Sequence, residues 1–200
     1  MSGWIKICGL TDAAGVAAAV AAGVDAIGFV FAPSVRRVTA ERAAELALGV
    51  RRTLTCVAVT QHPEQQDVDA IVRGFHPDLL QTDHEDFALL HLPQRLARLP
   101  VLRGAQAPPA ELPPRILFEG ARSGSGEVGD WQQAASLAQR TRLVLAGGLH
   151  AGNVGAAIRA VRPFGVDTSS GVESRPGVKS AARIAEFVQA ARAAFREIAA

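Results

Sequence analysis

Polar side chains that could do acid–base chemistry follow several short apolar runs in this sequence of 200 residues. A thiolate or carboxylate can take a proton, a carboxylic acid can give one, and an arginine can bind an anion. The residues at the ends of the runs are Cys8, Ser34 to Arg37, Gln81 to Asp83, Arg103, Glu119 and Asp167. This set predicts proton transfer on an anionic small molecule.

Two segments near the end of the chain indicate that the anion is a phosphate. Leu145-Ala146-Gly147-Gly148-Leu149 and Gly165-Val166-Asp167-Thr168-Ser169-Ser170-Gly171-Val172-Glu173 are apolar runs that stop at small residues. A helical pattern follows each, over 153–161 and 178–198. Small residues at such loops expose backbone N–H groups, which bind phosphate.

The elements that must position these residues alternate between short strands and Ala-rich helices. Helices are expected over 12–22, with Asp12 near the N-cap and Gly23 as the stop, over 40–48 with Thr39 as the cap, and over 68–74. The expected strands are 5–8, 26–31, 54–59, 79–81, 101–103, 116–119, 143–146 and 165–167.

Eight strands with intervening helices predict an α/β fold, a single (βα)8 TIM barrel. The stretch 105–114 holds four prolines, so we expect an irregular fifth connection in place of a full helix. A flavodoxin-like doubly wound sheet is the competing architecture, which periodicity alone does not exclude.

Composition favours one domain over residues 1–200. The chain is 48% hydrophobic and 20% charged, and its net charge is +2. No basic patch, signal peptide or membrane span stands out, so neither nucleic acid nor membrane is expected as a partner. Cys8 and Cys56 are the only cysteines, which predicts no disulfide framework and a cytoplasmic location.

Several residues have a structural interpretation beside the functional one. Cys8 is either a small buried hydrophobe or a general base, and Glu119 is either a solvated loop residue or a general acid. Cys56 is interpreted as a residue of the hydrophobic core. The histidines have no metal-ligand spacing, so no metal is expected. Gly124-Ser125-Gly126 lacks the third glycine of a dinucleotide fingerprint.

Six motifs follow one another along the whole chain. They are Lys6-Ile7-Cys8-Gly9-Leu10-Thr11, Gly28-Phe29-Val30-Phe31 with Ser34 and Arg36, Gly124-Ser125-Gly126 with Asp130-Trp131, Leu145 to Leu149 with Asn153-Val154, Gly165 to Glu173, and Pro176-Gly177-Val178-Lys179. With these motifs the sequence resembles the phosphoribosylanthranilate isomerases of tryptophan biosynthesis. That resemblance implies a (βα)8 barrel that works without cofactor or metal. It also implies an Amadori rearrangement of N-(5'-phosphoribosyl)anthranilate to 1-(2-carboxyphenylamino)-1-deoxyribulose 5-phosphate.

The resemblance also implies roles for individual residues. Cys8 is the base that removes the C2' proton, and the carboxylic acid after the sixth strand, Glu119, protonates the furanose ring oxygen. Arg36 and Asp167 contact the anthranilate end or hold the intermediate. Gln81 is assigned to substrate binding. The phosphate is held by backbone groups of Gly147, Gly148, Ser170 and Gly171.

This sequence departs from the family pattern at two strand ends. The acid is ordinarily Asp, where this chain has Glu119, and the usual Gln-x-His-Gly is here Gln81-Thr82-Asp83-His84. The Glu119 substitution keeps an alternative open: a catalytically impaired, phosphate-binding barrel that acts as a partner or regulatory protein. A barrel isomerase of the kind found in histidine biosynthesis ranks lower, because such enzymes use carboxylate pairs. The oligomeric state is left as monomer or homodimer.

Overall fold

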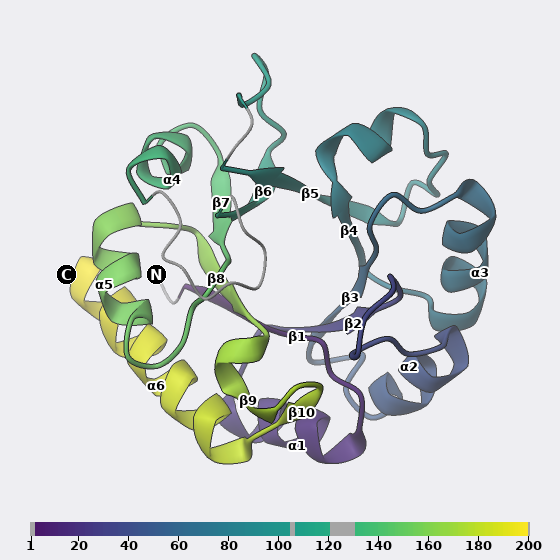
Figure 1. Ribbon diagram of the computed structural model, residues 1–200, viewed down its shortest axis with the longest axis horizontal. Coiled ribbons are helices and arrows are strands. Elements are labelled where there is room, and N and C mark those ends of the chain that lie inside the picture. The colour runs from purple at the N-terminus through teal and green to yellow at the C-terminus, as the bar shows by residue number, and fades with distance from the viewer. Residues whose placement is uncertain (1–2, 105–106, 121–130, 200) are drawn as a thin grey trace.

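The computed structural model is a closed barrel of eight parallel strands (Figure 1). It describes residues 3–104, 107–120 and 131–199. Each strand pairs with the next, and the first pairs with the last, so the predicted (βα)8 barrel is confirmed and the doubly wound sheet is excluded. The strands are β1 (Trp4–Cys8), β2 (Ala26–Val30), β3 (Thr55–Val59), β4 (Leu79–Asp83), β5 (Ala97–Arg103), β6 (Arg115–Glu119), β7 (Arg142–Leu145) and β8 (Gly165–Thr168).

Helices surround the barrel, and local sequence signals set their ends. Asp12 accepts a hydrogen bond from Gly15 N, and Thr39 accepts one from Arg42 N, so both predicted caps are confirmed. Gly23 ends the first helix in the left-handed conformation. The helices are α1 (Ala13–Ala22), α2 (Ala40–Ala47), α3 (Gln65–Phe75), α4 (Trp131–Ala138), α5 (Val154–Val161) and α6 (Ala181–Ala199).

Two connections lack an α-helix among the described residues. A 3₁₀ helix, His84–Ala88, joins β4 to β5, and residues 107–114 between β5 and β6 contain no helix, as the prolines predict. Proline restricts this segment because it lacks the N–H that a helix interior requires.

The C-terminal helix begins later than the sequence pattern predicts. Val178–Lys179 forms β10, which pairs antiparallel with β9 (Glu173–Arg175), so the prediction of a helix from Val178 was wrong at this end. Pro176-Gly177 makes the turn between them, with Gly177 at φ 82°. This hairpin precedes α6.

Side chains alternate between the two faces of each barrel strand, and that alternation positions the site. Ile5 and Ile7 of β1, Leu80 of β4 and Ile116 and Phe118 of β6 pack outward in the main core between strands and helices. Leu99, Val101, Leu117 and Val144 form an inner cluster. Near the strand ends, Gln81, Asp83, Arg103 and Glu119 occupy positions that alternate with outward-facing ones, so their side chains face the barrel interior like those of the inner cluster.

The outer core predicts a large stability effect at Phe75. Its ring is fully buried at the end of α3 and packs edge-on against Phe29 at 5.3 Å between centroids. Phe75→Ala removes this contact and leaves a cavity, so we expect the free energy of unfolding to fall by about 3–5 kcal/mol in urea titration. Leu89→Ala is the control, because Leu89 is 79% exposed. A Phe75→Ala protein as stable as the Leu89→Ala protein would contradict this packing.

Candidate active site

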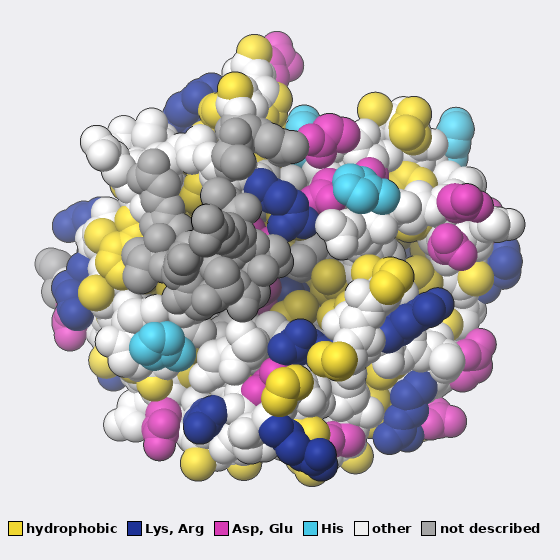
Figure 2. All heavy atoms as spheres, viewed as in Figure 1, with side chains coloured by type: hydrophobic (Ala, Val, Ile, Leu, Met, Phe, Trp, Pro, Cys, Tyr) yellow, Lys and Arg dark blue, Asp and Glu magenta, His cyan; other side chains and the backbone are white. Residues whose placement is uncertain are grey.

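A cavity of about 320 Å³ opens where the strands of the barrel end. Figure 2 shows this face, with basic and acidic side chains around a central hollow. A cavity of this size suits a small molecule. Of the site residues predicted from the sequence, eight line it: Cys8, Arg36, Gln81, Glu119, Gly147, Gly148, Asp167 and Ser170. Gly171 lies instead in a neighbouring depression beside His150.

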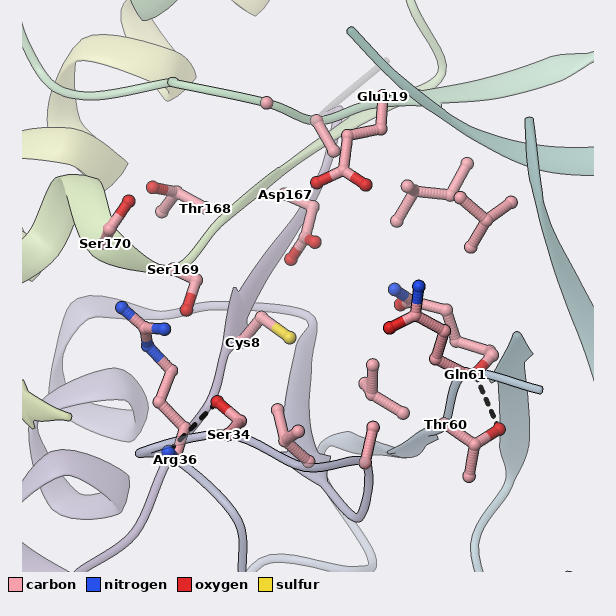
Figure 3. A pocket seen from close by; sticks show the side chains of 18 of the residues that line it. Cys8, Ser34, Arg36, Thr60, Gln61, Glu119, Asp167, Thr168, Ser169 and Ser170 are labelled. Atoms are coloured by element: carbon pink, nitrogen blue, oxygen red, sulfur yellow. Dashed lines mark hydrogen bonds between the residues drawn. The ribbon is translucent and has the colours of Figure 1, made fainter. Parts of the chain in front are cut away.

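Cys8, Asp167 and Glu119 point into the same space (Figure 3). Asp167 lies between the Cys8 sulfur and the Glu119 carboxylate in this view. They come from β1, β8 and β6, so the closed barrel brings together side chains that are far apart in the sequence.

Lys6, two residues before Cys8, is completely buried inside the barrel and pairs with Asp167. Its Nζ donates to Asp167 Oδ1 at 2.9 Å. Burial lowers the pKa of Lys6, but the negative charge of Asp167 and the adjacent Cys8 together raise it above its ordinary value. Lys6 therefore stays a cation within the barrel.

The Cys8 thiol shares its surroundings with the Lys6 side chain. A methyl group on Gly28, opposite Cys8 in β2, would lie 3.0 Å from both Cys8 Sγ and Lys6 Cε, so any larger residue there would push these two side chains aside by a few tenths of an ångström. Burial raises the pKa of Cys8 above its ordinary value, and Asp167 adds to that effect. Lys6 and Lys179 act in the opposite direction, because each cation favours a thiolate.

Arg36 is held by a buried carboxylate. Its Nε and Nη2 donate to the two oxygens of Glu173 at 2.7 Å each, and Lys179 Nζ donates to Glu173 at 2.8 Å. Burial opposes ionisation of Glu173, but Arg36 and Lys179 lower its pKa to about 2. The Ser34 hydroxyl also accepts from Arg36 N at 3.1 Å. Arg36 is thus fixed in one orientation at the cavity wall.

Glu119 contacts Arg103, the last residue of the neighbouring strand. Arg103 Nη1 donates to Glu119 Oε2 at 2.6 Å, and Arg103 Nη2 donates to Asp83 Oδ1 at 2.8 Å. Burial lowers the pKa of Arg103, but Glu119 and Asp83 together raise it. The three residues form a row of ion pairs along the ends of β4, β5 and β6.

Gly147 and Gly148 turn sharply after β7, at φ 90° and 62°. These angles favour glycine because a Cβ is strained there. The Asn153 side chain donates to Gly148 O at 2.9 Å and holds the loop against the start of α5. Ser170 begins the short 3₁₀ helix Ser170–Val172 after β8. The two loops are neighbours because β7 and β8 pair.

The structure adds polar residues that the sequence did not single out as functional. Lys6, Lys179 and Glu173 lie within the predicted motifs, but their pairing depends on contacts between distant segments. The sequence offered one signal for Lys6: it lies two residues before Cys8 on the same strand, so both side chains point to the same face of the strand.

Gln81 lines the cavity, and its Oε1 is buried without a hydrogen-bond partner. Gly124-Ser125-Gly126 and Asp130 lie outside the described residues.

Within the described part of the chain, one group has the side chains of a metal site. His62, Asp83 and Asp86 place one potential ligand atom each within 4.8 Å of one another. His62 already contacts Asp86 with Nδ1 at 2.9 Å and Asp83 with Nε2 at 3.3 Å, and Asp83 also accepts from Arg103. The ion pairs of these residues therefore explain why the three side chains lie close together.

The family model described as N-(5'phosphoribosyl)anthranilate (PRA) isomerase matches residues 5–190. The chain belongs to this family. It is an aldose–ketose isomerase of tryptophan biosynthesis, as the sequence resemblance predicts. The N-(5'-phosphoribosyl)anthranilate isomerase of Nitrobacter hamburgensis is 38% identical, with 97% of this chain and 95% of the relative covered. That of Bradyrhizobium sp. is 40% identical, with 97% of each covered.

Solved structures of PRA isomerases share the architecture. TrpF from Jonesia denitrificans is 37% identical, with a TM-score of 0.81 over 96% of this chain and 98% of that one. A PRA isomerase in complex with reduced 1-(o-carboxyphenylamino)-1-deoxyribulose 5-phosphate is 27% identical, with a TM-score of 0.77 over 96% and 99%. A third structure shows monomers made from the dimeric isomerase of Thermotoga maritima, at 26% identity and a TM-score of 0.80 over 96% and 99%.

None of the helices in the described ranges combines the length and the apolar character that a membrane crossing requires.

The buried Glu173 carboxylate predicts a pH-dependent contribution to the stability of this PRA isomerase. Its pKa of about 2 lies below the ordinary value of 4.5, so the stabilisation is complete above about pH 4.5 and is lost as the pH falls toward 2. Glu173→Gln leaves Arg36 and Lys179 without their counter-charge and is expected to lose about 3 kcal/mol at pH 7.

Urea unfolding of the wild-type protein and of Glu173→Gln between pH 7 and pH 3 measures this effect. The matched control is Glu197→Gln, because the Glu197 side chain is 56% exposed and also pairs with an arginine, Arg159. We expect the control to change by less than about 1 kcal/mol. A Glu173→Gln deficit that stays constant down to pH 3 would show that the ion pairs of Glu173 do not supply the stability.

Proposed function

We propose that this PRA isomerase performs its reaction with Glu119 as general acid and Cys8 as general base, on a substrate whose phosphate is held by the loops after β7 and β8. The observation that carries this proposal is the convergence of the Cys8 sulfur and the Glu119 carboxylate on one cavity (Figure 3). The chain is proposed to work as one catalytic domain, in the cytoplasm, as a monomer or homodimer, with no cofactor, metal or nucleic acid.

The first half of the reaction opens the sugar ring. Glu119 gives its proton to the furanose oxygen while the bond from that oxygen to C1' breaks. The nitrogen lone pair of the anthranilate then forms the C1'=N bond of a protonated Schiff base. Arg103 contacts the Glu119 carboxylate and stabilises the negative charge that remains after the transfer.

The second half moves a proton away from C2'. The Cys8 thiolate takes the C2' proton, and the C–H electrons form the C1'=C2' bond of an enolamine while the iminium nitrogen becomes neutral. C1' then takes a proton from water, and the C2' hydroxyl releases its proton to water as the C2'=O bond forms, which completes the Amadori rearrangement. The Cys8 thiol loses its proton to solvent and the Glu119 carboxylate regains one from solvent, so both groups return to their starting states. Lys6 and Lys179 favour the thiolate, and the positive Schiff base adds a further charge of the same sign during the reaction.

The rest of the cavity wall is proposed to orient the substrate. Arg36 uses Nε and Nη2 on Glu173 and would contact the anthranilate carboxylate through Nη1. Asp167, fixed by Lys6, would accept from the substrate amine or hydroxyls. Gln81 offers its buried Oε1 to a substrate hydroxyl. Binding energy from groups that do not react holds the sugar in a reactive orientation.

The phosphate is proposed to rest on backbone N–H groups of Gly147, Gly148, Ser170 and Gly171. Gly147 and Gly148, both at positive φ, line the cavity together with Ser170, and backbone N–H groups in such turns can form a concave anion-binding site. The direct test of the proposed function is a fluorescence assay, because the anthranilate-like emission of the substrate falls as product forms. A purified, folded protein that leaves the emission unchanged would overturn the proposal.

Removal of the Cys8 thiol is expected to lower kcat by about 10²–10⁴-fold, since the substrate then lacks its base. Cys8→Ala should unfold at nearly the wild-type urea concentration, and Cys56→Ala should keep its kcat, because Cys56 lies in the outer core. In the Glu119→Gln protein, where the acid no longer titrates, the residual kcat/KM should rise with pH and still be rising at pH 9, because burial raises the pKa of Cys8 from its ordinary value of 9.0. A Cys8→Ala protein with wild-type turnover rules out Cys8 as the base.

Substitution of Glu119 tests the acid. Glu119→Gln keeps the shape of the side chain but has no proton to give, so we expect kcat to fall by about 10²–10⁴-fold in the fluorescence assay. Glu119→Asp should also lose activity, because a displacement of about 1 Å from the reactive position costs about 10²-fold. If Glu119→Asp exceeds the wild-type rate, the longer side chain is a defect in this chain and not an adaptation of its site.

A further inference from the structure

Arg103 bridges two carboxylates at the edge of the cavity. Asp83, Arg103 and Glu119 are the last residues of β4, β5 and β6, which are neighbours in the barrel. One guanidinium nitrogen contacts Glu119 Oε2 at 2.6 Å, and the other contacts Asp83 Oδ1 at 2.8 Å. A planar guanidinium can serve both carboxylates at once, whereas an ammonium group has no such fixed geometry.

Asp83, the carboxylate on the other side of Arg103 from Glu119, is itself held in place by a neighbouring residue. The second oxygen of Asp83 contacts His62 Nε2 at 3.3 Å. His62 is held by Asp86, which accepts from its Nδ1 and its backbone N and from the Thr82 hydroxyl. Asp83 therefore has a partner on each oxygen, so it holds Arg103 in a single orientation.

We propose that Arg103 is a positioning residue that orients the Glu119 carboxyl for proton transfer to the ring oxygen, with Asp83 as the anchor of Arg103. This inference rests on the proposed role of Glu119. Glutamate has one more rotatable bond than the aspartate usual in the family, so its carboxyl needs an additional constraint. Arg103 supplies that constraint at Oε2 and stabilises the carboxylate after the proton has left.

The test compares Arg103→Met and Arg103→Lys with the wild type in steady-state fluorescence assays. We expect Arg103→Met to lower kcat by about 30–100-fold with KM within about threefold, because Arg103 acts on the acid and not on substrate binding. Arg103→Lys should recover only part of the loss, since an ammonium group keeps the charge but lacks the fixed planar geometry that serves both carboxylates. The control is Arg98→Met, an exposed arginine earlier in β5, which should keep the wild-type kcat.

A double-substitution cycle separates this proposal from the proposed function. If Arg103 acts through Glu119, Arg103→Met should cause little further loss in a Glu119→Gln background. Losses that multiply, or a raised KM with kcat retained, would show that Arg103 acts on the substrate directly and would overturn the inference. Full activity of Arg103→Met with an inactive Glu119→Gln overturns the role of Arg103 alone, whereas an active Glu119→Gln overturns the role of Glu119. Should Arg103→Met fail to fold, Arg103→Lys tests the role of Arg103 in its place, by its kcat, its KM and its further loss in the Glu119→Gln background.

Discussion

The buried ion pair between Lys6 and Asp167 is the interaction on which the site most depends. Lys6 is completely enclosed by the barrel, and a buried ammonium is tolerated only when a carboxylate and hydrogen bonds compensate for lost hydration. The pair joins β1 to β8, where the barrel closes. It also places a cation beside the Cys8 thiol and fixes the Asp167 carboxylate at the centre of the cavity (Figure 3).

Around this pair, the cavity wall is made of charges that hold one another in place. Glu173 fixes Arg36 and Lys179 on one side, and Arg103 connects Glu119 to Asp83 on the other. Such preorganised charges stabilise developing charge without rearranging during the reaction. Gly147, Gly148, Ser170 and Gly171, which are proposed to hold the phosphate, have no charged side chain and would act through backbone N–H groups. Phosphate binding and proton transfer are thus proposed to use different physical means in the same barrel.

Much of this arrangement could be predicted from sequence, for a physical reason. Apolar runs that stop at Cys8, Glu119 and Asp167 place those residues at strand ends, and a closed parallel barrel brings strand ends together. The partner of Lys6 could not be predicted, because Asp167 is 161 residues away and the pairing depends on the register of β1 against β8. The β9–β10 hairpin was missed because strands of three and two residues are too short to show a periodicity.

The central claim is that Glu119 and Cys8 act on one substrate from the two sides of a single cavity. The most direct test is a crystal structure of this protein with reduced 1-(o-carboxyphenylamino)-1-deoxyribulose 5-phosphate. We predict the Glu119 carboxyl within about 3 Å of the oxygen that closes the ring in the substrate, Cys8 Sγ next to C2', and the phosphate on the loops of Gly147 and Ser170. A complex in which the Glu119 carboxyl points away from the sugar, or in which Cys8 does not face C2', would contradict the claim.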